Sequence, residues 1–98
     1  MAQLIINSYD DISSIDTVIE GSMEVLSDDG AEDSPMYSDW EDIWDVLREH
    51  VCTAPGVYTG VYPVIIEMDR FSGEQTTMMH NLMEDCAQAF DEFTAVIK

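Results

Sequence analysis

Residues 63–68 read PVIIEM, a short apolar run rich in β-branched residues that predicts a buried strand. Residues 3–7 (QLIIN) carry a similar run near the N-terminus. Unbroken apolar runs are typical of strands that are covered on both faces, as in a parallel sheet. Residues 94–97 (TAVI) are a third strand candidate, although the preceding helix could also continue through them.

Segments with helical periodicity separate these strands. In each segment, apolar residues recur at intervals of three and four positions, so that they share one face. A serine followed three residues later by Asp, Glu or Gln predicts helix starts near Ser13, Ser38 and Ser72. The apolar stripes cover residues 12–26, 40–51 and 79–93.

The predicted order is strand, helix, helix, strand, helix, strand, within a single domain of residues 1–98. Helical connections between strands favour parallel pairing. We therefore predict an α/β fold, with a small three-stranded parallel sheet packed against three to four helices. Residues 52–60 (CTAPGVYTG) contain turn residues without helical periodicity and are predicted to form a loop.

The charge of the chain is strongly one-sided. Three basic residues oppose 21 acidic ones, which gives a net charge of −18. Such a chain lacks the basic patch that binding to nucleic acid or to an anionic membrane requires. A basic partner, a saline cytoplasm and a need for solubility are three explanations that the composition leaves open.

Two cysteines, Cys52 and Cys86, are too few for a disulfide framework and have no zinc-site spacing. We predict that both are buried thiols and that the protein needs no metal or other cofactor. The N-terminal sequence lacks the basic region and the apolar stretch of a signal peptide, and no apolar run approaches the ~20 residues of a membrane span. These features predict a cytoplasmic protein.

Acidic residues are concentrated in and before the second predicted helix. Helical spacing places Glu41, Asp45 and Arg48 on one face, with Trp44 at its edge and Asp39 in the first turn. Carboxylates beside an aromatic ring could occupy the phosphate positions of a basic, nucleotide-binding cleft. The same pattern is also typical of an ordinary solvated helix face with a core tryptophan.

The segment SDWEDIWDVL, residues 38–47, resembles the signature of the barstar family. Residues 62–71 (YPVIIEMDRF) resemble the second strand of that family and its exit, and residues 4–26 resemble its first strand, turn and helix. The resemblance spans nearly the whole chain in the same order. It implies a three-stranded parallel sheet packed against helices, and inhibition of guanyl-type ribonucleases by insertion of the second helix and its adjacent loop into the active site.

The resemblance also implies roles for individual residues. Asp45 matches the central acid of the phosphate pocket, Glu41 a second acid, Trp44 and Tyr37 interface aromatics, and Glu92 a peripheral acid. The chain departs from the family pattern at Asp39, where Asn is usual, and at Arg48, where a small neutral residue is usual. The partner-binding residues expected from pattern and resemblance together are Tyr37, Asp39, Glu41, Trp44, Asp45, Arg48 and Glu92.

The functional hypothesis is therefore a non-enzymatic inhibitor that forms a one-to-one complex, as a monomer, with a basic ribonuclease or nuclease toxin domain. The alternative is a nucleic-acid mimic that blocks a DNA-binding enzyme, and it would spread its charges along a stripe. A third possibility is a generic interaction domain. Antiparallel strands, or Glu41 and Asp45 on opposite sides of their helix, would contradict the hypothesis.

Overall fold

Three α-helices account for more than half of the chain in the computed structural model, which describes residues 2–98. Each helix buries one apolar stripe against a shared core, as the sequence periodicity predicts. The helices are α1 (Tyr9–Asp28), α2 (Pro35–Val51) and α3 (Gly73–Ala89), and a 3₁₀ turn, η1 (Met68–Arg70), precedes α3.

A serine caps the start of each of these helices. The hydroxyl groups of Ser8, Ser34 and Ser72 accept hydrogen bonds from the backbone N–H three residues later, at 3.3, 3.3 and 3.1 Å. Each bond satisfies one of the N–H groups that a helix start leaves unpaired. The predicted capping box at Ser72 is confirmed. The starts predicted at Ser13 and Ser38 are wrong, because both residues lie inside helices that are capped earlier in the chain.

The main sheet has three strands in the order β4-β1-β5. They are β1 (Gln3–Ile6), β4 (Val64–Glu67) and β5 (Val96–Ile97), so the strand candidate near the C-terminus is confirmed. Both neighbours of β1 run antiparallel to it, with Ile5 opposite Ile65 on one side and Val96 on the other. The predicted parallel sheet, and with it the barstar-like fold, is therefore wrong: the fold is α+β.

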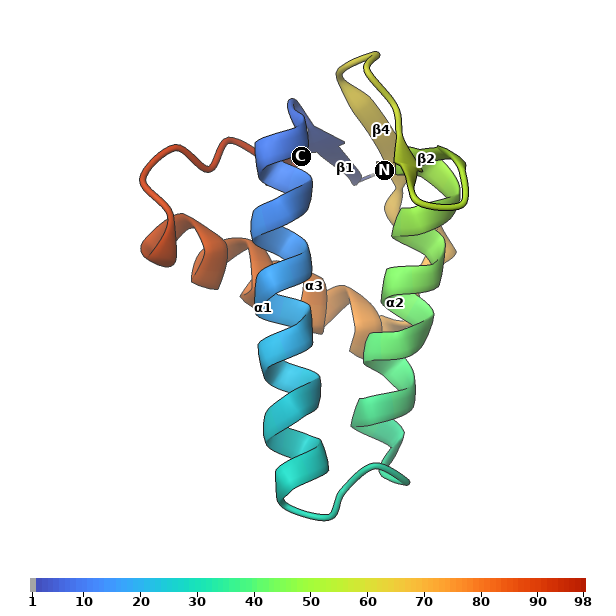
Figure 1. Cartoon of the computed structure of the whole chain (residues 1–98), viewed down its shortest axis with the longest axis vertical. Helices are drawn as coiled ribbons and strands as arrows, with labels where there is room; N and C mark the ends of the chain where they lie inside the picture. The colour runs from blue at the N-terminus through green and yellow to red at the C-terminus, as the bar shows by residue number, and fades with distance from the viewer. Residues whose placement is uncertain (1) are drawn as a thin grey trace.

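The two consecutive helices explain this strand direction. A single helix would carry the chain back to the end of the sheet where β1 began, so the next strand would run parallel to β1. Here α1 descends from the end of β1, and α2 returns beside it after a short connection (Figure 1). The chain therefore enters β4 at the end of the sheet where β1 finished, and β4 must run antiparallel to β1.

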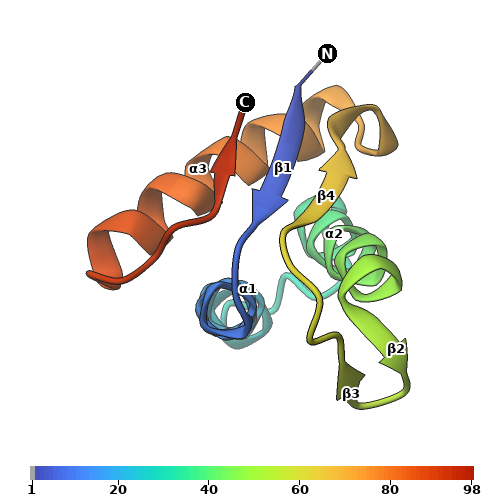
Figure 2. The same ribbon diagram turned by 90° about the horizontal axis from the view of Figure 1, so that it is seen from above.

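Residues 52–60, predicted as a loop, contain a small β-hairpin. Strands β2 (Cys52–Ala54) and β3 (Val57–Tyr58) pair antiparallel. Gly56 forms part of the tight turn between them and has a φ of 74°, a conformation that glycine adopts without steric cost. The hairpin projects from the end of α2, on the side of the molecule opposite α3 (Figure 2).

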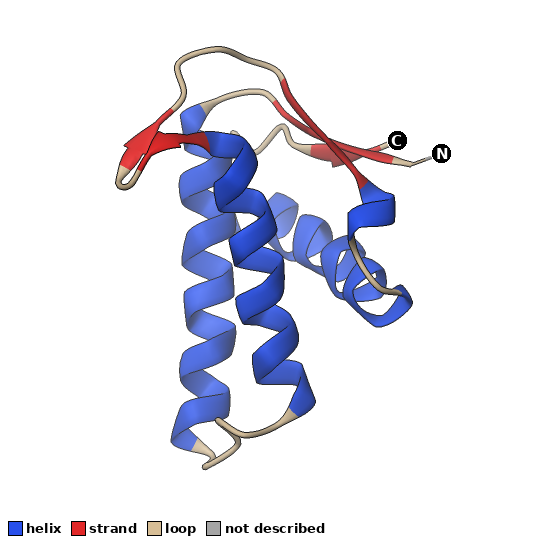
Figure 3. Ribbon diagram, turned by 90° about the vertical axis from the view of Figure 1, so that its right-hand side faces the viewer, coloured by secondary structure: helices blue, strands red, loops and turns tan. Residues whose placement is uncertain are grey.

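The sheet lies across one end of the α1–α2 pair, and α3 crosses behind both helices (Figures 1 and 3). Leu4 and Ile6 of β1 and Ile66 of β4 point into the core. The opposite face of the sheet is uncovered and leaves Ile65 and Val96 exposed. Nowhere in residues 2–98 is a helix long and apolar enough to cross a membrane.

Candidate functional site

The outward face of α2 carries most of the residues that the sequence singled out. Glu41, Asp45 and Arg48 are exposed there, at intervals of four and three residues. Trp44 lies at the edge of this face, half-buried and packed against the core. Glu41 and Asp45 point to the same side of the helix, so this part of the expectation is confirmed.

A second row of carboxylates follows α1, and the sequence analysis missed it. Asp16, Glu20, Glu24 and Asp28 are spaced four residues apart, so that each lies one turn beyond the last, over about 18 Å of helix. The four-residue interval was readable in the sequence. The apolar stripe of α1 does not reveal this row, because the four acids lie outside the stripe.

Tyr58 of the β2–β3 hairpin lies near charged residues of both helices. Burial raises the pKa of Tyr58, nearby Cys52, Asp16 and Tyr9 raise it further, and the charge of Arg48 lowers it. Residues from both helices are therefore within electrostatic reach of this one side chain. Tyr58 also packs edge-on against Tyr9, with ring centroids 5.2 Å apart and planes at 70°.

The opposite sides of the same helices face α3. The thiol of Cys86 in α3 donates a 3.8 Å hydrogen bond to the backbone carbonyl oxygen of Ser14 in α1. Ser14 lies about 200° around the α1 axis from Asp16, so Asp16 is on the other side of this helix. We name the side turned away from α3 the acidic face. It comprises Asp16, Glu20, Glu24, Tyr37, Glu41, Trp44, Asp45, Arg48 and Tyr58.

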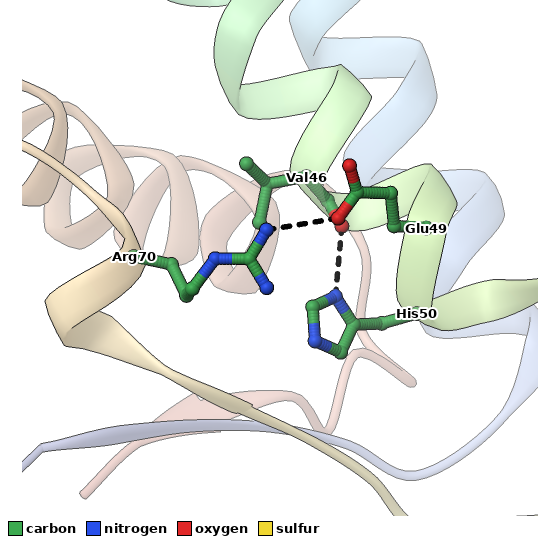
Figure 4. Close-up of polar contacts among 4 residues, drawn as sticks. All are labelled: Val46, Glu49, His50 and Arg70. Atoms are coloured by element: carbon green, nitrogen blue, oxygen red, sulfur yellow. Dashed lines mark hydrogen bonds and ion pairs between the residues drawn. The ribbon is translucent and has the colours of Figure 1, made fainter.

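Two of the three basic residues pair with carboxylates of α2. Arg48 forms an ion pair with Asp45, and both side chains are more than half exposed. Arg70 donates to Glu49 over 2.8 Å, and this hydrogen bond and the charge of Arg70 hold the pKa of Glu49 below its ordinary value (Figure 4). Figure 4 also shows His50, whose Nδ1 lies 2.9 Å from the Val46 carbonyl oxygen. Exposed pairs of this kind contribute little to stability, so a cation of a binding partner can replace the arginine.

A pocket of about 670 Å³ adjoins the ion pair between Arg48 and Asp45. It lies between the last turns of α2 and the β2–β3 turn at Pro55 and Gly56, and Cys52 forms part of its wall. Across residues 2–98, no group of three or more His, Cys, Asp or Glu side chains is placed to hold a metal ion.

Asp39 and Glu92 do not join the other predicted residues. Asp39 is nine residues from Arg48, which turns it to the opposite side of α2, where it accepts a 3.1 Å hydrogen bond from Gln75 of α3. Glu92 follows the end of α3 and borders a separate pocket of about 560 Å³ with Asp10 of α1. The structure therefore does not bring Asp39 and Glu92 together with Asp45.

Searches for relatives leave the family of this chain open. No family model matches it, and no curated protein or solved structure matches it either.

Proposed function

We propose that this protein is a non-enzymatic inhibitor that covers the active-site cleft of a basic ribonuclease or nuclease toxin domain. The observation that carries the proposal is the acidic face. There, carboxylates of two antiparallel helices lie beside aromatic rings, with Arg48 as the only basic residue in the set. The antiparallel strands contradict the hypothesis in the form that rests on a barstar-like fold, so nuclease inhibition is proposed from the acidic face alone.

Charge supports a partner with a phosphate-binding cleft. A net charge of −18 would attract a basic protein over long distances and raise the association rate, an effect that weakens as salt rises. Within the complex, Glu41 and Asp45 would occupy positions that substrate phosphates take. Tyr37 and Trp44, both half-buried, would add aromatic contact area at small entropic cost.

Arg48 gives this binding mode a specific feature. Its guanidinium already neutralises Asp45, so a cation of the partner has to replace it. The exchange costs little in water, because the exposed pair is weak, and it becomes favourable where the partner excludes water from the carboxylate.

The decisive experiment compares two single-acid variants against a nuclease captured from lysate of the organism that encodes the chain. Asp45→Ala should weaken inhibition by roughly 2–5 kcal/mol, since it leaves a cation of the partner unpaired. Asp85→Ala is the matched control, because Asp85 is an exposed acid of α3, away from the acidic face. Equal inhibition by both variants, or the absence of any inhibited nuclease, would contradict the proposal.

A second function, mimicry of a nucleic-acid strand, is favoured by the row of carboxylates on α1. This row extends the negative charge beyond the α2 patch, as binding to a long DNA groove would require. Paired variants distinguish the two: Glu41→Gln with Asp45→Asn removes charge from α2, and Glu20→Gln with Glu24→Gln removes the same charge from α1. A compact nuclease cleft should respond mainly to the first pair, and a long DNA groove to both.

The remaining parts of the proposal concern the state of the protein. We propose a monomer that forms a one-to-one complex without a cofactor. A cytoplasmic location agrees with the two free thiols at Cys52 and Cys86, since reducing compartments keep thiols unpaired.

A further inference from the structure

A groove on the back of the molecule lies between the start of α2 and the first half of α3. Its walls include Pro35, Met36 and Asp39 of α2 together with Glu74, Thr77 and Met78 of α3, and its volume is about 480 Å³. Asp39 lies on the side of α2 opposite Arg48, so this groove is separate from the acidic face. We name it the methionine groove.

The lining of the methionine groove is mostly apolar, although it opens to solvent. Met36 is 52% exposed, and Met78 is half-buried against the core. Methionine side chains are flexible and polarizable, and they are frequent on surfaces that bind apolar side chains of other proteins. An exposed methionine beside a second one on a neighbouring helix gives such a side chain contacts on two sides.

Carboxylates border this apolar floor. Asp39 accepts a hydrogen bond from Gln75, which also accepts one from the Ser72 backbone, so the cap of α3 orients the Asp39 side chain. Glu74 lies in the first turn of α3. None of the residues that line the groove is basic, so the carboxylates there have no cation within the groove.

We propose that the methionine groove binds a basic amphipathic helix of a partner protein. One large apolar side chain of that helix would enter between Met36 and Met78, and a Lys or Arg one turn away would reach Asp39 and Glu74. The apolar floor selects an apolar side chain, and the acidic border selects a flanking cation, which is the complement of a basic amphipathic helix. The volume of the groove accommodates side chains rather than a whole domain. This inference does not depend on the proposed nuclease inhibition.

The test uses a labelled peptide of Leu and Lys with Leu at helical spacing, and the full-length protein with ¹³C-methyl methionine. Binding should shift the methyl resonances of Met36 and Met78. Two control peptides, one with Glu in place of Lys and one with the same residues in scrambled order, should bind at least several-fold more weakly. Shifts that spare both methionines, or equal binding of either control peptide, would overturn the proposal.

Matched variants separate this groove from general attraction between opposite charges. Asp39→Asn with Glu74→Gln should lower the affinity for the peptide by about three- to tenfold, which corresponds to the loss of two exposed ion pairs. Asparagine at position 39 retains an oxygen that can accept from Gln75. Glu20→Gln with Glu24→Gln removes the same charge from the acidic face and should change affinity less than about twofold. Equal effects of the two pairs would show non-specific attraction and would refute the groove as the site.

Met36→Ser tests the apolar half of the proposal without disturbing the core, because Met36 is half exposed. This variant should bind the peptide measurably more weakly, while its thermal unfolding temperature stays nearly unchanged. Unaltered affinity in this variant would count against the groove. So would chemical-shift changes confined to the methyl groups of the other methionines.

Discussion

Asp11 is the only charged side chain that is fully buried within the described part of the chain. Its carboxylate accepts from the backbone N–H of Asn7 at 3.1 Å, the backbone N–H of Thr94 at 2.8 Å and the Thr94 hydroxyl at 2.7 Å. These bonds join the start of α1 to the segment before β5, 83 residues further on. A buried carboxylate is tolerated here because several donors replace its water.

We expect Asp11→Ala to destabilise the fold by roughly 1–3 kcal/mol, because it leaves the part-buried backbone N–H groups of Asn7 and Thr94 without this acceptor. Asp10→Ala removes the same charge from the exposed neighbouring position and should change stability by less than about 0.5 kcal/mol. Urea unfolding followed by circular dichroism measures both. Similar midpoints for the two variants would show that Asp11 does not join the two ends of the chain.

The role of Asp11 was only partly readable from the sequence. Ser8 and Asp11 have the spacing of a helix cap, which could have placed the start of α1 correctly. The bonds to Thr94 were not predictable, because no local pattern connects residues so far apart in the chain. Ser13 and Asp16 have the same spacing, so the local pattern alone does not decide between the two starts.

The two cysteines should differ in reactivity. Burial raises the pKa of Cys86 to about 11, and the nearby charges of Asp85 and Asp11 add to this shift. Only about one Cys86 in a thousand is then a thiolate at pH 8, and the side chain is also inaccessible. Iodoacetamide at pH 8 should therefore modify the partly exposed Cys52 first, and Cys86 only after unfolding, as peptide mass spectrometry would show. Equal labelling in the native protein would be inconsistent with the buried position of Cys86.

Asp16 should oppose folding at neutral pH. Burial raises its pKa above the ordinary 3.8, and the charge of Glu20 raises it further. The folded state therefore binds this proton more tightly than the unfolded state, so stability falls as pH rises through the window that begins near pH 3.8. Asp16→Asn should raise the urea midpoint at pH 7 and lose this advantage below that window. A variant less stable than the wild type at pH 7 would indicate that Asp16 makes a favourable contact instead.

At the scale of elements, the sequence predicted which segments form helices and strands better than it predicted their directions. The apolar stripes of α1 and α2 and the runs of β1 and β4 lie where the pattern placed them. The stripe predicted at 79–93 was too long, because α3 ends at Ala89 and Phe90 and Phe93 follow it. The predicted parallel sheet was wrong because a parallel pair needs a single crossover, whereas two consecutive helices separate β1 from β4. Two helices in succession return the chain to the end of the sheet that it left. The predicted order already contained two consecutive helices, so it was sufficient to indicate an antiparallel strand.

The hairpin at residues 52–60 was hidden for a different reason. Its strands are three and two residues long, too short for an alternating pattern to stand out. Pro55 and Gly56 indicated a turn but could not show that the flanking residues pair. This omission mattered for the site, because Tyr58 of the hairpin lies near Asp16 of α1 and Arg48 of α2.

The end of α1 offers a prediction with an internal control. Gly30 has a φ of 75°, its N–H donates to the Ser27 carbonyl at 3.0 Å, and the N–H of Ala31 donates to the Leu26 carbonyl at 2.7 Å. This pattern is a Schellman motif, which requires the left-handed conformation that glycine adopts most easily. Gly21, by contrast, lies inside α1 with no atom within 4 Å of an added Cβ.

We therefore expect Gly30→Ala to destabilise the protein by about 1 kcal/mol and Gly21→Ala to stabilise it by roughly 0.5–1 kcal/mol. The chemical change is the same in both variants, so the opposite signs isolate backbone conformation. Thermal unfolding under identical conditions measures the difference. Two shifts of the same sign would mean that the conformation at one of these glycines is not the one described.

At the scale of the whole molecule, composition predicted the acidity but not its arrangement. Helical spacing was enough to place Glu41, Asp45 and Arg48 on one side of α2. The contribution of α1 depends on how the two helices pack, and the separation of Asp39 depends on where α3 crosses. Tertiary contacts therefore decide which carboxylates act together, and a single sequence carries little information on them.

The net charge of −18 should make folding and binding respond to salt in opposite directions. The molecule measures 38 × 29 × 26 Å, and charges interact over about 30 Å at 0.01 M salt but only about 10 Å at 0.1 M. At low salt nearly all carboxylates therefore repel one another, whereas at 0.1 M only neighbours such as Asp16 and Glu20 do.

Raising sodium chloride from about 0.01 to 0.1 M should move the urea midpoint upward, while the association rate with a basic nuclease should fall. The variant with Glu20→Gln and Glu24→Gln should show a smaller shift of the midpoint, because less repulsion remains to be screened. A midpoint that is constant or falls with added salt would mean that repulsion among these carboxylates does not limit the stability of the fold.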